Sequence, residues 1–584
     1  MRWIRRTREL LPALLAASAI AIAGASAGLG CRKAPAPIGT RSAGPPQRGG
    51  TLHLANTVDL RTLDPAVAFD TESQPYLELM YAGLVDYDDK GAIVGDLAER
   101  WEMSPDGRTY RFFLRRGVKM QDGSDFLAAD VKRSVERTLH PKTSCPASSF
   151  FERIEGYAAL QAGTSEQLPG VVVEAPHVVA FHLTHADATF LAVLALDFLR
   201  PVCKTAGARY DDTFGAHACG AGPFQLDDWQ PGRFLRVKRF DGYWNAAATH
   251  LDAVELRMNV PRLTQRFQFE RGEQDLLNEF ERPDRVRFAE DPRWAPYGVQ
   301  RIDGAVYGEF MNVEMRPFDD ARVRRAVAAA INRPNIQRYL EGGSLVTGHL
   351  FPPQIPGYDP TYAGQVYDLA KARTLMAQAG YAYDPATGAG GYPETIAYYA
   401  GDGEGSLRWA QLLQYDLAQI GVRIEIKVTS FSQYLAETGR RRTARMGWAG
   451  WNLDFPDPSD FLDPIFASKS IQQEESQNHA FYRNPALDEL LERAHDELDP
   501  KARIAMYQQA ERIVVDDAPW AFEMYPMRYE LVQPYVRDYR AHPIWLLYVR
   551  DAWIDAKGRP TQTAALGGRR LGAALGALLG PRAR

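Results

Sequence analysis

The sequence predicts an α/β protein with more than one domain, and three observations lead to this expectation. The chain has 584 residues, about three to four times the usual length of a single domain. Its residues are 45% hydrophobic, 24% charged and 11% aromatic, which is typical of a folded globular protein rather than a disordered or fibrous one. Patterns typical of strands and of helices alternate along the chain.

Strand signals occur near the start of the chain and again in its second half. Residues 52–54 and 422–428 have the two-residue hydrophobic period of a strand that buries one face. Residues 104–107 read Ser-Pro-Asp-Gly, a turn sequence, and they stand between Trp101 and the hydrophobic run 110–114. This arrangement predicts a β-hairpin.

Helix signals lie mostly in the second half of the chain. Hydrophobic residues at helical spacing predict helices over residues 323–331, 409–420 and 487–494. Gly421 ends the second of these directly before a predicted strand, which gives one αβ unit. Asp499 and Pro500 are suited to the N-cap and first turn of a further helix.

The net charge of −5 is unevenly distributed. Residues 1–48 carry +7 and residues 557–584 carry +6, which leaves −18 for residues 49–556. Binding to nucleic acid needs concentrated lysine and arginine, because phosphate groups must be neutralised. The acidic body therefore argues against a nucleic-acid partner.

The N-terminus predicts an export signal over residues 1–31. A basic segment precedes an apolar run, residues 10–25, that is too short for a comfortable bilayer span. Two processing sites could end this signal. Ala-Ser-Ala at 25–27 suits cleavage by a signal peptidase, and Gly-Leu-Gly-Cys at 28–31 resembles a bacterial lipobox. We favour lipidation at Cys31, although Gly28 stands where lipoboxes usually carry an aliphatic residue.

Further features of the ends support a chain exported to the periplasm or cell surface. Residues 32–48 are rich in proline and glycine and predict a tether. An arginine pair at 5–6 also resembles a twin-arginine signal, which is an alternative export route. No later segment has 18 uninterrupted apolar residues, so the body is not expected to span a membrane.

The remaining cysteines suit an oxidising compartment. If Cys31 carries a lipid, Cys145, Cys203 and Cys219 are left. Cys203 and Cys219 are our first choice for a disulfide, with Cys145 as an alternative partner or a free thiol. We expect neither a metal site nor a cofactor, because the chain has no Cys-x-x-Cys or His-rich spacing and no Walker A loop.

An ordered series of short motifs covers nearly all of residues 49–556. The motifs include Gly-Gly-Thr-Leu at 49–52, Leu-Asp-Pro at 63–65, Tyr-Ala-Gly-Leu at 81–84, Leu-Ala-Glu-Arg-Trp at 97–101, Gly-Ala-Gly-Pro-Phe at 220–224, Arg-Pro-Phe-Asp-Asp-Ala-Arg-Val-Arg at 316–324 and Ala-Pro-Trp at 518–520. Together they resemble the family 5 solute-binding proteins of ABC importers, the dipeptide- and oligopeptide-binding class. So many motifs in a fixed order are very improbable by chance.

The resemblance implies a two-lobed, periplasmic-binding-protein-like fold with mixed sheets, a hinge and an extra inserted domain. It predicts lobe I at residues 49–90, 215–305 and 525–556, the inserted domain at 91–214, lobe II at 306–524 and a basic tail at 557–584. For the tail we expect disorder, and a helix lying on an anionic membrane surface is the alternative.

The resemblance also indicates residues that contact ligand. Peptide-binding members take the ligand's α-ammonium with an aspartate after a Gly-Trp pair and before an acidic-Pro step, a place that Asp454 occupies. Asp457 is the reserve candidate, and a turn aspartate before proline is the structural alternative for Asp454. Arg445 stands where some members place an arginine for the ligand carboxylate. Trp448 and Trp451 are candidates for apolar walls, with core packing as the alternative.

The function that the resemblance implies is capture of peptides and their delivery to a permease. Energy would come from a separate ATPase, since this chain has no nucleotide-binding loop. Non-peptide cargo known in the family, such as nickel, haem, opines or oligosaccharides, is the first alternative. An exported hydrolase is the second, but no motif places a catalytic residue, so we expect a monomeric binding protein rather than an enzyme.

Overall fold

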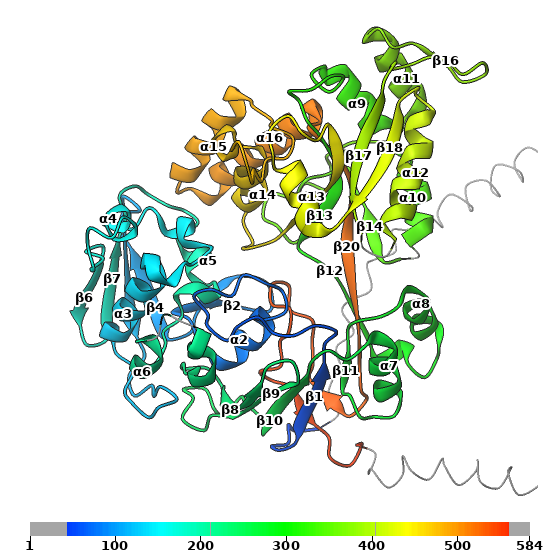
Figure 1. Ribbon diagram of the computed structural model, residues 1–584. Coiled ribbons are helices and arrows are strands. Elements are labelled where there is room, and N and C mark those ends of the chain that lie inside the picture. Colours follow the sequence, from blue (N-terminus) through cyan, green and yellow to red (C-terminus); the bar gives the residue numbers. More distant parts are fainter. Residues whose placement is uncertain (1–43, 209, 211, 341, 403–404, 560–584) are drawn as a thin grey trace, which may run out of the picture.

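The computed structural model describes residues 44–208, 210, 212–340, 342–402 and 405–559. These residues form two lobes (Figure 1). We call the lobe with strands β1 and β4–β10 the lower lobe, and the lobe with β13 and β17–β19 the upper lobe. Within the described residues, no helix combines the length and the apolar character needed to cross a lipid bilayer.

A four-stranded mixed sheet organises the lower lobe. Its strands, in sheet order, are β1 (Thr51–Ala55), β10 (Ala253–Arg257), β9 (Phe234–Arg239) and β8 (Phe224–Gln230). β1 runs parallel to β10, and the other pairs are antiparallel. Leu52 and Leu54 are buried while His53 between them is half-exposed, as the period of two predicted. The helices of this part are α2 (Gln74–Met80), α7 (Arg262–Glu270) and α8 (Arg282–Glu290).

A second, antiparallel sheet lies beside the first in the lower lobe (Figure 1). Its order is β4 (Ala98–Met103), β5 (Thr109–Leu114), β7 (Val178–His182) and β6 (Val171–Ala175). The predicted hairpin is β4–β5, and Gly107 in its turn has φ +67°, a left-handed conformation that favours glycine. Nearby elements are β2 (Val85–Tyr87), β3 (Ile93–Gly95), α3 (Ala128–Leu139), α4 (Tyr157–Gln161), α5 (Phe190–Leu194) and α6 (Lys204–Gly207).

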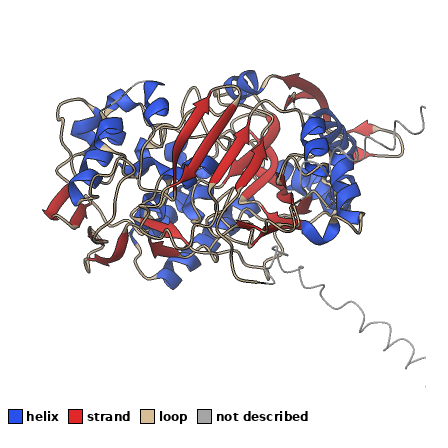
Figure 2. Cartoon of the chain, turned by 90° about the horizontal axis from the view of Figure 1, so that it is seen from below, coloured by secondary structure: helices blue, strands red, loops and turns tan. Residues whose placement is uncertain are grey.

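The upper lobe is built on a large mixed sheet. The sheet runs β20 (Trp520–Val532), β13 (Ala305–Met311), β19 (Met446–Asn452), β17 (Thr395–Gly401) and β18 (Arg423–Thr429), and β12 (Gly298–Ile302) and β14 (Ser344–Val346) also pair with β20. At its far end β20 pairs with β11 (Leu276–Leu277), which lies in the lower lobe (Figure 1). The predicted strand at 422–428 is β18, which lies parallel to β17. Figure 2 shows strands through the middle of the molecule with helices on both sides.

Helices pack on both faces of this sheet. They are α9 (Ala321–Ala330), α10 (Arg333–Leu340), α11 (Leu369–Gln378), α12 (Ser406–Ala418), α13 (Phe431–Thr438), α14 (Pro458–Phe466), α15 (Pro485–Asp496) and α16 (Pro500–Asp517). Alternate residues of β19 belong to two separate hydrophobic clusters, Met446 to one and Ala449 to the other. The lobe therefore has one core on each side of the sheet.

Two neighbouring segments cross between the lobes. β20 pairs with β13 through residues 520–524 and with β12 through residues 527–531. The second segment passes from β12 to β13 through Asp303 and Gly304, and the Asp303 N–H donates to the carbonyl of Pro526 at 2.8 Å. We call this region the crossing, and a rotation of one lobe against the other must deform it.

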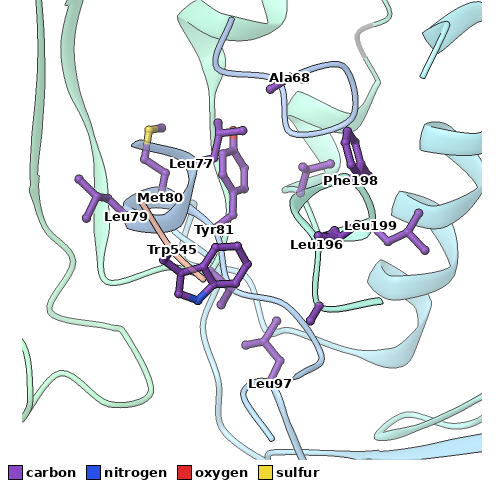
Figure 3. Packing of buried hydrophobic residues seen from close by; sticks show 14 of the residues in the cluster. Ala68, Leu77, Leu79, Met80, Tyr81, Leu97, Leu196, Phe198, Leu199 and Trp545 are labelled. Atoms are coloured by element: carbon purple, nitrogen blue, oxygen red, sulfur yellow. The ribbon is translucent and has the colours of Figure 1, made fainter. Parts of the chain in front are cut away.

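The chain returns to its beginning after the upper lobe. Trp545 packs in the lower-lobe core with Leu77 of α2 and with Tyr81, the residue after that helix (Figure 3). The short paired strands β21 (Val536–Arg537) and β22 (Trp553–Ile554) stand before and after it in the chain. Arg559 then donates to the carbonyl of Thr51 at 3.1 Å. The two ends of the folded body therefore lie together in the lower lobe, and residues 560–584 are outside the described part.

Candidate functional site

A cavity of about 120 Å³ lies where the two lobes meet. Its lining residues include Thr71, Glu78, Asp197 and Trp545 of the lower lobe, Arg301, Asp303 and Arg528 of the crossing, and Asn452, Leu453 and Asp454 of the upper lobe. We call it the interlobe cavity. Because both lobes contribute walls, movement at the crossing changes its shape, and clefts of this kind are common ligand sites.

Asp454 stands two residues after β19 and is half-buried at the cavity wall. Its N–H donates to the carboxylate of Asp460 at 3.0 Å. Among the described residues, none of the ion pairs or hydrogen bonds involves the carboxylate of Asp454. Burial raises the pKa of Asp454 to about 7, and burial also raises the pKa of Asp460 well above its usual value. A bound ammonium would supply the missing positive charge and favour the ionised carboxylate.

Asp457, the reserve candidate, has a structural role. Its carboxylate accepts from the N–H of Ser459 at 2.9 Å and caps helix α14. It also pairs with the buried guanidinium of Arg503 at 2.6 Å. The structural role expected of a turn aspartate before a proline therefore belongs to Asp457. Asp454 lines the cavity instead.

Trp448 and Trp451 lie three residues apart on β19 and face opposite sides of the sheet. The indole N–H of Trp451 donates to Asp460 at 3.3 Å, and its ring packs against the core beneath α14. The ring of Trp448 lies 5.1 Å from that of Tyr307 on the other face. The two tryptophans therefore do not wall one common site.

Trp448 lines a second cavity, of about 420 Å³, which we call the aromatic cavity. Its aromatic lining residues are Tyr307, Tyr339, Tyr398, Trp409, Phe431, Tyr434 and Trp448. The hydroxyl of Tyr307 donates to Asn452 at 3.0 Å, and Asn452 lines the interlobe cavity. Tyr307 therefore connects the two cavities along β13.

Two buried carboxyl groups lie next to the aromatic cavity. Glu309 accepts from the hydroxyl of Tyr398, one of the lining residues, at 3.1 Å. Both oxygens of Glu523 are buried without a hydrogen-bond partner in the described chain. Burial raises the pKa of Glu523 to about 8 and that of Glu309 well above its usual value. Both groups are therefore held largely in their neutral form near pH 7.

Arg445 is not brought to either cavity. It precedes β19, whose seven residues span about 20 Å, and Asp454 follows the same strand. The guanidinium of Arg445 pairs with Glu394 at 2.7 Å. Arg445 and Asp454 thus lie at opposite ends of one strand, and Arg445 is paired on the surface.

The structure places two other arginines at the interlobe cavity. Arg301 on β12 and Arg528 on β20 are directly opposed in the antiparallel ladder, and both line the cavity. Sequence reasoning missed them because 227 residues separate them and neither belongs to a motif. Only the register of the two strands brings them together.

The cysteine predictions concern other parts of the molecule. Cys203 and Cys219 form a disulfide in the lower lobe, and Cys145 is a buried free thiol. Asp122 lies near the two disulfide sulfurs, but these sulfurs are already joined to each other and are not thiolate ligands. Cys31 lies outside the described residues.

Sequence comparison relates the chain to known binding proteins. The model for the bacterial extracellular solute-binding proteins of family 5 (middle region) matches residues 92–473. The glutathione-binding protein GsiB of Salmonella choleraesuis (strain SC-B67) is 31% identical over 469 residues, which cover 79% of this chain and 86% of that protein. GsiB of Shigella dysenteriae serotype 1 (strain Sd197) is 29% identical over 469 residues, again 79% of this chain and 86% of that protein.

Solved structures show the same architecture. The periplasmic murein tripeptide binding protein MppA, in an unliganded open form, matches with a TM-score of 0.74 and 25% identity over 88% of this chain and 99% of its own. The periplasmic binding protein DppA from Helicobacter pylori, in complex with the peptide STSA, matches with a TM-score of 0.69 and 26% identity over 87% of this chain and 99% of its own.

Proposed function

The chain belongs to family 5 of the bacterial extracellular solute-binding proteins, and from this premise we propose that it captures peptides between its two lobes for an ABC importer. Membership of the family confirms the resemblance that the motif series predicted, together with the two-lobed α/β fold. The role of the family is binding, so we propose that this chain acts without chemical turnover.

Peptide cargo is supported by the names of the similar proteins. Those proteins are described as binding glutathione or a murein tripeptide, or as holding the peptide STSA. Every unmodified peptide brings one α-ammonium group into the site. A receptor for such cargo therefore needs an anion that is not already neutralised by the protein.

One observation carries the proposal for the site, namely the unpaired carboxylate of Asp454 at the wall of the interlobe cavity. We propose that it binds the ligand's α-ammonium, and that Trp448 contributes to an apolar wall for a ligand side chain. Closure of the lobes would exclude water and strengthen the ion pair. Trp451 and Arg445 are not part of this proposal, because their polar groups are engaged with Asp460 and Glu394.

The cellular setting is proposed from the sequence and the family. Residues 1–31 would direct export, Cys31 would carry a lipid anchor and residues 32–48 would form the tether. A permease and its separate ATPase would receive and transport the cargo. We propose the lobe division of 49–90, 215–305 and 525–556 against 306–524, with residues 91–214 inserted.

Native mass spectrometry on protein freed of co-purified ligand tests the proposal. The wild type is challenged with a pool of dipeptides to hexapeptides and with the same peptides N-acetylated. We expect retention of the free peptides, a loss of affinity of at least about 30-fold in Asp454→Asn, and no change in Arg445→Ala, the matched control on the same strand.

Two results would contradict parts of the proposal in different ways. Equal binding of free and N-acetylated peptides would exclude Asp454 as the ammonium site. Failure of a folded protein to retain any peptide would exclude peptide cargo, and pools of nickel complexes, haem, opines and oligosaccharides would then be tested.

A further inference from the structure

The two lobes also touch outside the crossing, through a pair of aromatic rings. Phe150 lies in the short 3₁₀ helix η2 (Ser148–Phe151) of the lower lobe, and Phe455 directly follows Asp454 in the upper lobe. The ring centroids lie 5.7 Å apart with an interplanar angle of 76°, a favourable edge-to-face arrangement. We propose that Phe150 is a positioning residue that raises peptide affinity by holding Phe455, and with it Asp454, in the binding arrangement. This inference rests on the proposed function, because it takes Asp454 as the ammonium site.

Phe455 belongs to the upper lobe by sequence but packs in the core of the lower lobe. Its side chain is 6% exposed, and it stands in the same hydrophobic cluster as Leu77, Tyr81 and Trp545. Within the described chain, no other residue of the stretch 306–524 is among the buried members of that cluster. A rotation that separates the lobes must therefore take this ring out of an apolar core and expose it to water, which opposes opening.

The lower lobe fixes the position of Phe150. This residue is half-buried against the lower-lobe core, and its N–H donates to the carbonyl of Ala147 at 3.1 Å. The next residue, Phe151, is fully buried in the same core. The ring of Phe150 is thus held where Phe455 meets it, so little side-chain entropy is lost when the lobes come together.

A single peptide unit joins Phe455 to the proposed ligand site. Asp454 lines the interlobe cavity, whereas neither ring of the aromatic pair belongs to the cavity lining. The Cα atoms of consecutive residues are about 3.8 Å apart. The Asp454 N–H is held by the carboxylate of Asp460, and the helix cap at Asp457 fixes the segment on its other side. A shift of the ring therefore displaces the Asp454 carboxylate, and a ligand that holds this carboxylate also holds the ring.

Two further contacts join the same faces of the lobes. Arg153 Nη1 lies 3.7 Å from Asp496 Oδ1 at the end of α15, and 67% of the Asp496 side chain is exposed. Exposed ion pairs contribute little to stability. In the β4–β5 turn, a Cβ added to Gly107 would lie 2.9 Å from Leu498 Cδ2 of the upper lobe. The aromatic pair is therefore the contact that we expect to contribute most.

A double-mutant cycle on peptide affinity tests the inference. Calorimetry with tri-alanine would compare the wild type, Phe150→Ala, Phe455→Ala and the double variant. Each single variant should bind about tenfold more weakly, because it loses one aromatic contact and a smaller share of the protein has its lobes together. The double variant should bind less than about threefold more weakly than either single variant. A larger further loss would show that the rings act independently, and would overturn the inference.

Dissociation kinetics and a conservative variant distinguish positioning from a general loss of structure. Because the contact forms only when the lobes are together, most of the loss in Phe150→Ala should appear as faster dissociation in a stopped-flow displacement assay. Phe150→Leu keeps an apolar side chain without the ring, and we expect it to restore about half of the lost affinity on a logarithmic scale. Phe267→Ala is the matched control, since it removes a phenylalanine that is 44% exposed on α7 of the same lobe, and it should leave affinity unchanged.

The failure of this inference differs from the failure of the proposed function. If the wild type binds tri-alanine and Phe150→Ala binds it equally well, the positioning role is wrong and the proposed function stands. If the folded wild type retains no peptide, both are overturned. Thermal unfolding monitors every variant, and if Phe150→Ala does not fold, the same cycle with Phe150→Leu decides, with an expected loss of about threefold.

Discussion

The interlobe cavity and the aromatic cavity lie along the same pair of strands but differ in chemistry. The first is lined by charged groups that include Arg301, Arg528 and Asp454, and the second is lined by seven aromatic side chains. Charged groups recognise features that all peptides share, namely their two ends. Aromatic walls interact with whatever side chain enters. Under the proposed function, the difference predicts a receptor that discriminates peptides by their charged ends and accepts varied side chains.

We expect the largest difference between the two cavities in how their contributions to peptide binding depend on pH. The free carboxylate of Asp454 has a pKa of about 7, and a bound ammonium lowers this pKa, so binding below pH 7 must first remove a proton. We expect peptide affinity to fall about tenfold from pH 7.5 to pH 6. Calorimetry in buffers of different ionisation enthalpy would detect the released proton. Asp454→Asn should bind weakly with a flat profile, and a flat profile in the wild type would contradict the assignment.

Trp448→Ala addresses the aromatic cavity. Because this ring packs against Tyr307 inside the cavity, its removal should weaken peptides with a bulky side chain by about tenfold, or ~1.4 kcal/mol. The affinity for tri-alanine should not change, since we propose that its charged N-terminus contacts the interlobe cavity. Competition assays with a matched series of side chains would measure this, and a uniform loss for all peptides would show that the cavities do not act separately.

Glu523→Gln tests the buried carboxyl group beside the aromatic cavity. The folded-state pKa of about 8 lies above the ordinary value of 4.5, so the folded protein holds this proton more tightly than the unfolded chain does. Stability from this group is therefore fully present below about pH 4.5 and is lost as the pH rises towards 8. The variant should be more stable than the wild type at pH 8 by at least about 1 kcal/mol.

The measurement for Glu523 is thermal unfolding of both proteins at pH 5 and pH 8. The gain in the variant should be several times smaller at pH 5 than at pH 8. An equal gain at both pH values would mean that packing or hydrogen bonding, rather than the proton, is responsible.

Local signals in the sequence predicted local structure well. Gly421 has φ +73° at the end of α12, as expected for the residue that ends a helix before a strand. The side chain of Asp499 accepts from the N–H of Ala502 and caps α16, as expected for an N-cap before proline. Each of these features depends on a few neighbouring residues, which is why one sequence suffices to predict it.

Site residues were harder to predict, because cavities join distant segments. Asp454 was predicted through a motif, and the structure places it at the interlobe cavity, but the sequence does not reveal that Asp457 is the residue that caps the helix. Arg445 is close to Asp454 in sequence, yet β19 separates them by its whole length. Arg301 and Arg528 are far apart in sequence and adjacent in space. The length of β19 and the register of β12 against β20, which no single-sequence pattern specifies, decide the last two outcomes.

The contact between Arg559 and Thr51 has a mechanical consequence. Both ends of the described body lie in the lower lobe, so the proposed N-terminal anchor would act on that lobe. The chain enters and leaves the upper lobe through the crossing, and the lobes also touch elsewhere: the rings of Phe150 and Phe455 lie 5.7 Å apart and Arg153 pairs with Asp496 at 3.7 Å. A rotation of the upper lobe must therefore break these contacts, while the proposed anchor would stay with the lower lobe.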